Sequence, residues 1–238
     1  MSREPSVLGR RTDSVYAQLA AVAQEAAAGG LDAARDDHWP RPLDPRTARQ
    51  AAVLLLFGAL DDVPAASGKP LAPAGLDVLL IERAATLTDH PGQVAFPGGG
   101  VDAGDVSVDA AALREAVEET GLDPAGVQIL GRLPEVALPV SNFMVTPVLA
   151  WWMAPSPVAV VDYGESAQVF RVPVRDLLDP DNRYTATLKR GPRTYSSPAF
   201  LVNGVLVWGF TAGILSRLFD HLGWSVPWDA DRVIVAPL

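Results

Sequence analysis

Cysteine is absent from the 238-residue sequence, which excludes disulfides, thiolate metal ligands and a cysteine nucleophile. Long apolar runs are missing as well. The densest, AAVLLLFGAL from Ala51, is about half of the roughly 20 residues needed to span a bilayer. The N-terminal stretch MSREPSVLGRR carries charges but has no apolar core of the signal-peptide kind. These absences predict a cytoplasmic protein that does not contact a membrane.

Basic residues are scarce. Lys and Arg number 19 against 28 Asp and Glu, which gives a formal net charge of −9. Phosphate backbones are bound mainly through clustered Lys and Arg, so this deficit argues against a nucleic-acid partner. An anionic small-molecule substrate would need local positive charge, which a bound cation can supply. The sequence leaves the oligomeric state open, a homodimer included.

The chain divides into an N-terminal arm and one larger region. Residues 12–29 are rich in Ala, start at an N-cap-like Thr or Asp and stop at paired Gly, which predicts a peripheral helix. The segment that follows is charged and punctuated by Pro, as is typical of a connector. We therefore expect a helix and connector arm over residues 1–49 and the main domain over residues 50–238.

Short apolar runs bounded by turn residues recur along the main domain and predict buried strands. These runs cover residues 51–57, 76–83, 127–133, 143–152, 167–174 and 184–188. Two helices separate them, at about 107–120 and 209–222, and each is followed by Gly. The pattern predicts an α+β domain, an α/β/α sandwich with a mixed β-sheet flanked by helices.

Three glutamates crowd the end of the first of these helices, in the sequence LREAVEETGL. Helical spacing puts Glu115, Glu118 and Glu119 on one face. The apolar residues of the opposite face are expected to pack on a sheet: Ala110, Leu113 and Val117. The carboxylates face the negative end of the helix dipole and one another, and each unfavourable contact costs a few tenths of a kcal/mol.

Arg114 is four residues before Glu118 and can pair with it, which offsets one of the three charges. A hard divalent cation such as Mg²⁺, which takes oxygen ligands, would offset the rest. The run FPGGGVDAGD precedes the helix, and its glycines Gly98, Gly99 and Gly100 let backbone approach a ligand closely. The glycines and the acidic helix together form a candidate metal–phosphate site.

The order of glycines, spacer and REAVEETGL resembles the box of the Nudix hydrolases, whose second half reads Arg-Glu-apolar-any-Glu-Glu-any-Gly-apolar. Every defined position of that half matches: Arg114, Glu115, Ala116, Glu118, Glu119, Gly121 and Leu122. The first half departs from the general box. The glutamate expected there falls on Val106 when counted from Gly100; counted from Gly99, Asp105 takes its place with one extra residue before Arg114.

The lengthened box, with LLIERAATLTDHPGQVAFPGG upstream, resembles the branch of the family that hydrolyses coenzyme A. Three downstream segments are similar to that branch as well: SNFMVTPV, ESAQVFRVPV and VWGFTAGIL. Where the branch usually carries a second Arg before its His, this chain has Thr88.

This resemblance implies the Nudix fold and a metal-dependent hydrolase that cleaves coenzyme A or acyl-coenzyme A. The products would be adenosine 3′,5′-bisphosphate and (acyl-)4′-phosphopantetheine. One alternative is a Nudix diphosphatase acting on ADP-ribose or another nucleoside diphosphate derivative. A second alternative is a non-catalytic Nudix-fold binding module.

The resemblance also implies roles for individual residues. Glu115 and Glu119 would be the principal ligands of Mg²⁺ or Mn²⁺, with Glu118 completing the cluster and the Gly99 carbonyl as a backbone ligand. Arg114 would orient the glutamates.

Further residues have both a functional and a structural interpretation. Glu165 is nominated as a metal-associated acid or base, the alternative being a solvated loop carboxylate. Arg83 is expected to contact phosphate, and His90 is either a phosphate contact or a turn residue. A predicted Gly-Pro hairpin carries a basic tip that is either a 3′-phosphate contact or a solvated loop: Lys189, Arg190 and Arg193.

Overall fold

The computed structural model describes residues 14–31, 43–44, 46–60, 71–87 and 90–237. It divides into two compact units. Unit 1 comprises Met1–Val22, Ala59–Leu76 and Pro173–Leu238, and unit 2 comprises Ala23–Gly58 and Asp77–Val172. The helix α2 (Val15–Ala27) runs from the first unit into the second and lies within the range predicted for a helix.

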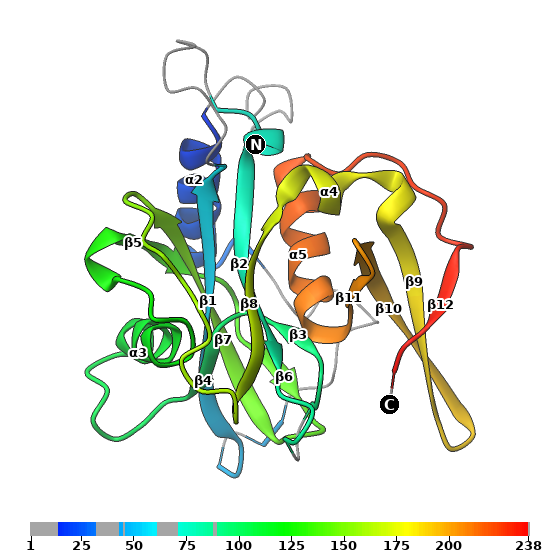
Figure 1. The fold of residues 1–238 in the computed structure, drawn as a ribbon, viewed down its shortest axis with the longest axis horizontal. Helices are drawn as coiled ribbons and strands as arrows, with labels where there is room; N and C mark the ends of the chain where they lie inside the picture. The colour runs from blue at the N-terminus through cyan, green and yellow to red at the C-terminus, as the bar shows by residue number, and fades with distance from the viewer. Residues whose placement is uncertain (1–13, 32–42, 45, 61–70, 88–89, 238) are drawn as a thin grey trace. The chain divides into compact units, whose positions relative to one another are not determined.

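Unit 2 is built on one mixed sheet, in which the strand order is β3-β2-β1-β7-β5 (Figure 1). Three further strands join this path, β4 on β1, β6 on β7 and β8 on β2. The strand bounds are β1 (Arg49–Ala59), β2 (Leu76–Arg83), β3 (Val94–Ala95), β4 (Gly98–Gly100), β5 (Val127–Arg132), β6 (Val136–Leu138), β7 (Phe143–Trp152) and β8 (Ser166–Pro173). β1 runs parallel to β7 and antiparallel to β4.

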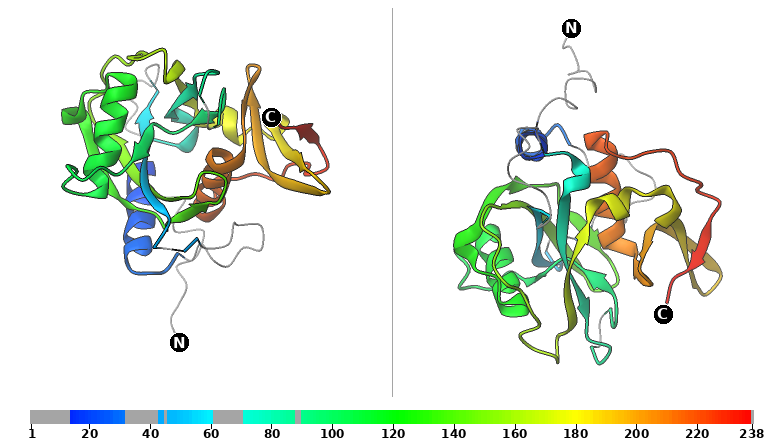
Figure 2. Two further views of the ribbon diagram at one scale, coloured as in Figure 1. Left: turned by 90° about the horizontal axis from the view of Figure 1, so that it is seen from below. Right: turned by 45° about the horizontal axis from the view of Figure 1, so that its top comes forward.

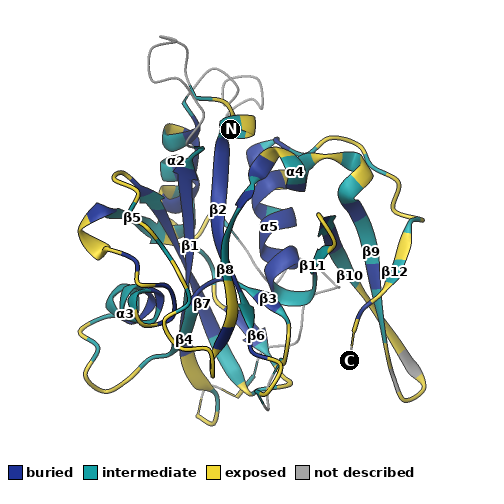
Figure 3. Ribbon diagram, in the orientation of Figure 1, coloured by how far each residue is buried: buried dark blue, intermediate teal, exposed yellow. Residues whose placement is uncertain are grey.

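The central strands are apolar along their length because both faces of the sheet are covered. Leu54, Leu55 and Leu56 follow one another in β1 and are all fully buried. Such a run is typical of a strand buried on both sides rather than on one. Figure 3 shows this burial over most of β1 and β2, with the first residues of β1 exposed.

The helix α3 (Val108–Thr120) packs against this sheet, as the views in Figure 2 show. It starts at Ser107, whose Oγ accepts a hydrogen bond from the N–H of Ala110 at 3.1 Å. It ends at Gly121, which has φ 67°, a left-handed conformation that glycine adopts without strain. The stop predicted at Gly121 is confirmed.

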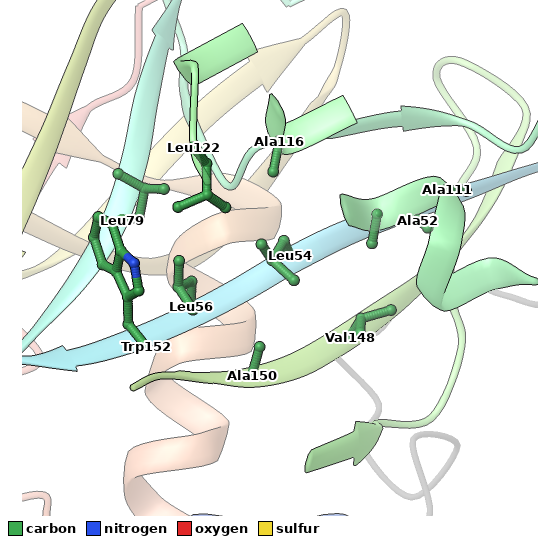
Figure 4. Packing of buried hydrophobic residues seen from close by; sticks show 11 residues of the cluster. Ala52, Leu54, Leu56, Leu79, Ala111, Ala116, Leu122, Val148, Ala150 and Trp152 are labelled. Carbon is green, nitrogen blue, oxygen red and sulfur yellow. The ribbon is translucent and has the colours of Figure 1, made fainter. Parts of the chain in front are cut away.

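The packing face predicted for α3 is correct only at Leu113, at its edge. Leu113 packs against the core while only half-buried, and Ala110 and Val117 are half-buried as well, whereas Ala111 and Ala116 are completely buried against the sheet (Figure 4). Small side chains on this face let the helix approach β1 and β7 closely. The helix is therefore rotated from the expected orientation, and this rotation also buries one of its glutamates.

Unit 1 contains a second, four-stranded sheet with the order β11-β10-β9-β12. The helices and strands of this part of unit 1 are α4 (Val174–Leu178), β9 (Arg183–Arg190), β10 (Arg193–Val202), β11 (Val205–Val207), α5 (Gly209–Leu222) and β12 (Val233–Val235).

Three short 3₁₀ turns, found in both units, each begin at Pro: η2 (Pro73–Gly75), η3 (Pro124–Gly126) and η4 (Pro180–Asn182). The predicted Gly-Pro hairpin joins β9 to β10, and Gly191 in its turn has φ 60°.

The fold class predicted from the sequence is confirmed, and each of the six predicted strands is present. The second sheet was not predicted, and three of its four strands, β10, β11 and β12, correspond to no predicted apolar run. No helix in the described ranges is long and apolar enough to cross a membrane.

Candidate active site

The floor of the site is the glycine strand β4, paired to the start of β1 with Gly99 opposite Ala52. A side chain at position 99 would place its Cβ 2.6 Å from the carboxylate of Glu115. A side chain at Gly98 would collide with the carbonyl oxygen of Ala52. Glycine is therefore required at position 98, where the obstacle is the backbone of β1, whereas a side chain at position 99 would have to displace the carboxylate of Glu115.

Arg114 organises the acidic helix. Its Nε and Nη2 donate to the two carboxylate oxygens of Asp105, each at 3.0 Å. Its Nη1 donates to Glu115 at 3.0 Å and to Glu118 at 2.9 Å, and Nη2 also donates to the carbonyl of Gly100 at 3.0 Å. All five N–H groups of the guanidinium are thus directed at acceptors. Arg114 compensates two glutamates, where the sequence predicted one.

Either Asp105 or Val106 takes the place of the first glutamate of the box, depending on the glycine from which the box is counted. The Asp105 side chain is only 6% exposed and binds Arg114 through both oxygens, whereas Val106 is 94% exposed. Counting the box from Gly99 therefore agrees with the structure. The hydrogen bonds from Arg114 hold the pKa of Asp105 below its usual value. In the sequence, the extra residue between the glycines and Arg114 indicated that Asp105 pairs with Arg114.

Glu119 is the buried member of the three glutamates. One carboxylate oxygen accepts a hydrogen bond from the N–H of Gly98 at 2.9 Å. Burial raises the pKa of Glu119 to about 7; the charges of Glu115 and Glu165 also raise it, and Gly98 and Arg83 oppose the shift. Arg83, at the end of β2, and Glu165, in the turn before β8, are therefore both close enough to affect the charge of Glu119.

Glu115 and Glu118 differ from Glu119 in their surroundings. The Glu115 side chain is 19% exposed, and burial raises its pKa against the opposing effect of Arg114. The Glu118 side chain is 55% exposed and lies against Arg114. In the described part of the chain, no three His, Cys, Asp or Glu side chains are arranged to hold a metal ion. Two carboxylates nevertheless lie against the glycine strand, that of Glu115 beside Gly99 and that of Glu119 at the N–H of Gly98.

Arg83 and His90 come from the hairpin that joins β2 to β3. Arg83 ends β2, and its Nε is buried without a hydrogen-bond partner among the described residues. His90 has φ 57° in the turn, and its Nδ1 lies 3.2 Å from Oε1 of Gln93. This geometry agrees with a turn residue. Thr88 lies outside the described residues.

Glu165 ends a tight turn. Its N–H donates to the carbonyl of Asp162 at 3.1 Å, and its own carbonyl accepts from the N–H of Ala84 at 2.9 Å. The second hydrogen bond fixes the turn beside the end of β2, while the Glu165 side chain is exposed. Of the basic tip in unit 1, only the side chain of Lys189 is described, and it is exposed.

The NUDIX domain family matches residues 64–187, just over half of the chain. An uncharacterized Nudix hydrolase named NudL from Cronobacter sakazakii is 40% identical over 146 residues, covering 61% of this chain and 75% of the relative. The protein of the same name from Escherichia coli is 37% identical over the same shares. A MutT/nudix family protein from Enterococcus faecalis is similar in structure, with a TM-score of 0.45, 16% identity, and 93% of this chain and 76% of that one covered.

The chain belongs to the Nudix family. With this assignment the prediction of a Nudix pyrophosphohydrolase is confirmed at the level of the enzyme class.

Proposed function

We propose that this enzyme hydrolyses the diphosphate of coenzyme A or an acyl-coenzyme A, with Mg²⁺ or Mn²⁺ as cofactor. The metal-ion site is supported by one observation: the carboxylates of Glu115 and Glu119 lie close to the backbone of Gly98 and Gly99, which have no side chains. Mg²⁺ is usually held by one or two carboxylates, waters and substrate phosphates, which suits a site with two carboxylates and open backbone. The coenzyme A specificity rests on the lengthened box and the segment from Leu79 to Gly99.

The residues of the site divide the chemistry among them. A bound divalent cation supplies charge neutralisation on the diphosphate oxygens and lowers the pKa of an attacking water. Glu115, Glu119 and the Gly99 carbonyl would hold this cation. Arg114 fixes Glu115 through a hydrogen bond that leaves the other carboxylate oxygen available.

Arg83 and Glu165 act on the substrate and the water. The buried Nε of Arg83 has an unused donor beside the acidic cluster, and guanidinium groups bind phosphate oxygens through such donors. Glu165 carries an exposed carboxylate within electrostatic reach of Glu119, which suits a group that accepts the proton of the attacking water.

The test is a substrate panel with purified protein and Mg²⁺: coenzyme A, acetyl-coenzyme A, ADP-ribose, NADH and nucleoside triphosphates. We expect coenzyme A to yield adenosine 3′,5′-bisphosphate and 4′-phosphopantetheine with the highest kcat/KM. Turnover of another member with coenzyme A untouched would contradict the assignment and favour a diphosphatase for ADP-ribose or another nucleotide. No turnover of any member would favour a binding module.

A further inference from the structure

We infer that Arg49, held on the ring of Phe143, binds a phosphate group of the substrate other than the scissile diphosphate. The 3′-phosphate of coenzyme A is a group of this kind. The inference rests on the proposed function, because it concerns the same substrate. Both residues lie in unit 2, and Arg49 precedes the segment that matches the family.

Arg49 is fixed in place although it is exposed. Its guanidinium carbon lies 4.0 Å from the centroid of the Phe143 ring, and its Nη2 donates to the carbonyl of Ser141 at 3.1 Å. The backbone N–H of Arg49 donates to the carbonyl of Asn142 at 2.9 Å, and Asn142 donates to Thr47 at 2.8 Å. An exposed arginine held by a ring and a carbonyl loses little further freedom when it binds an anion.

The charge of Arg49 is not committed to a carboxylate. Three other arginines of unit 2 each have a carboxylate oxygen within 3.0 Å: Arg114, Arg132 and Arg171. Arg49 has no such partner among the described residues. In a protein of net charge −9, a guanidinium left open in this way is suited to an anionic ligand.

The glycine strand connects Arg49 to the catalytic residues. Paired residues on β1 and β4 point to the same face, so Gly99 and Ala52 face α3, while Gly100, Ala51 and Arg49 face the other way. A Cβ at Gly99 would meet Glu115, but a Cβ at Gly100 would have no atom within 4 Å. The open space on the Arg49 face of the glycine strand is therefore at Gly100, because a Cβ at Gly98 would meet the backbone of β1 and Ala51 is buried.

The spacing suits a substrate that carries a second phosphate. Arg49 is three residues along β1 from Ala52, about 10 Å at 3.3 Å per residue. A substrate with its diphosphate at Gly99 can extend over Gly100 toward the start of β1. Arg49 would then discriminate coenzyme A from nucleotides, such as ADP-ribose, that lack the additional phosphate.

The experiment compares coenzyme A with 3′-dephospho-coenzyme A, which keeps the diphosphate and lacks the 3′-phosphate. In the Arg49→Gln variant we expect the ratio of kcat/KM for the two substrates to fall about tenfold or more, mainly through KM for coenzyme A. Arg49→Lys, which keeps the charge but not the planar fork, should retain part of the ratio. Arg46→Gln, an exposed arginine three residues earlier, is the matched control and should leave the ratio unchanged.

An unchanged ratio in Arg49→Gln would overturn the inference. An equal loss for both substrates would overturn it too, and would indicate that Arg49 contacts the base or the sugar. Calorimetric binding of adenosine 3′,5′-bisphosphate and of AMP measures the same preference without turnover. If the wild type hydrolyses neither substrate, the proposed function fails, and the calorimetric ratio still decides the role of Arg49.

Discussion

Arg114 in unit 2 and Arg183 in unit 1 use the same side chain in opposite ways. The Arg114 side chain is 28% exposed and has three carboxylates within 3.0 Å. Arg183 is 1% exposed, and its hydrogen bonds go to the hydroxyls of Ser216 at 2.7 Å and Ser225 at 3.4 Å. In the described chain no carboxylate is paired with it. Burial accordingly lowers the pKa of Arg183.

The rings around Arg183 explain how it is tolerated. Its guanidinium lies 5.2 Å from the centroid of Phe200 and 4.9 Å from that of Trp228, so two aromatic faces share the contact with the cation. Arg183 thus joins β9 to α5 and the segment after it as a packing residue. Arg114, by contrast, holds charges that would otherwise repel. The difference predicts that one arginine serves stability and the other serves activity.

The largest effect on activity is expected from a substitution of Glu119. Glu119→Gln keeps the shape of the side chain but removes its charge, so kcat/KM should fall about a thousandfold, equivalent to roughly 4 kcal/mol. The fold should persist, because Glu119 already sits in a site that disfavours its charge. Steady-state kinetics and a thermal melt measure both. Asp181→Asn, at an exposed carboxylate, is the control, and retained turnover in Glu119→Gln would contradict a metal-ligand role.

The next effect concerns stability alone. Arg183→Ala should lower the free energy of unfolding by about 2–5 kcal/mol, because it opens a cavity between the two rings. Arg183→Met refills that volume and should stay within about 2 kcal/mol of wild type. Urea unfolding gives the stability, and kcat/KM per folded molecule should be unchanged in both. An equal loss in the two variants would mean that the charge of Arg183, rather than its packing, matters.

Arg114→Met should show the reverse pattern. Loss of the guanidinium frees Glu115 and should weaken Mg²⁺ binding about 10–100-fold, as is typical when a residue that orients ligands is removed. Arg114→Lys should fall between, since an ammonium cannot make all of these contacts at once. Mg²⁺ titrations of activity provide the measurement. A Mg²⁺ dependence equal to wild type in Arg114→Met would remove the comparison with Arg183.

A pH dependence of stability is also expected. The pKa of Glu119 is raised from 4.5 to about 7, so folding favours its protonated form. Its contribution to apo stability is full below about pH 4.5 and is lost as pH rises through 7, at most about 3 kcal/mol. Since metal ions bind the deprotonated carboxylate, Mg²⁺ should raise the Tm more at pH 8 than at pH 5. Differential scanning calorimetry at the two pH values tests this, and an equal rise at both would contradict it.

Apolar runs and helix stops were the part of the fold that the sequence could predict. The bounds of β2, β7 and α5 match their predicted ranges, because long apolar runs and a following glycine are strong local signals. β4 was missed because three glycines have poor strand propensity, and only the pairing with β1 makes them a strand. The orientation of α3 was predicted from its larger apolar residues, Leu113 and Val117. The fully buried contacts are made by alanines instead, because their small side chains let the helix lie closer to the sheet.

For the candidate site, the sequence could identify the residues but not the contacts among them. Spacing alone identified the glutamates and Arg114, but it could not reveal that Arg114 would reach Asp105, Glu115 and Glu118 together. The proximity of Glu165 to Glu119 depends on a turn held to β2 from far along the sequence. The roles of these residues stay predictions, as do the basic tip, the boundary at residue 50 and the cytoplasmic location.

The position of β1 has a practical consequence for anyone who wishes to produce the catalytic region alone. The family match begins at residue 64, yet β1 ends at Ala59 and lies between β2 and β7 in the sheet. A fragment started at the family boundary would lose its central strand and expose two apolar edges, a template for aggregation. It would also lose the strand that pairs with Gly98 to Gly100, so we expect truncation from this side to cause aggregation and to disrupt the floor of the candidate site together.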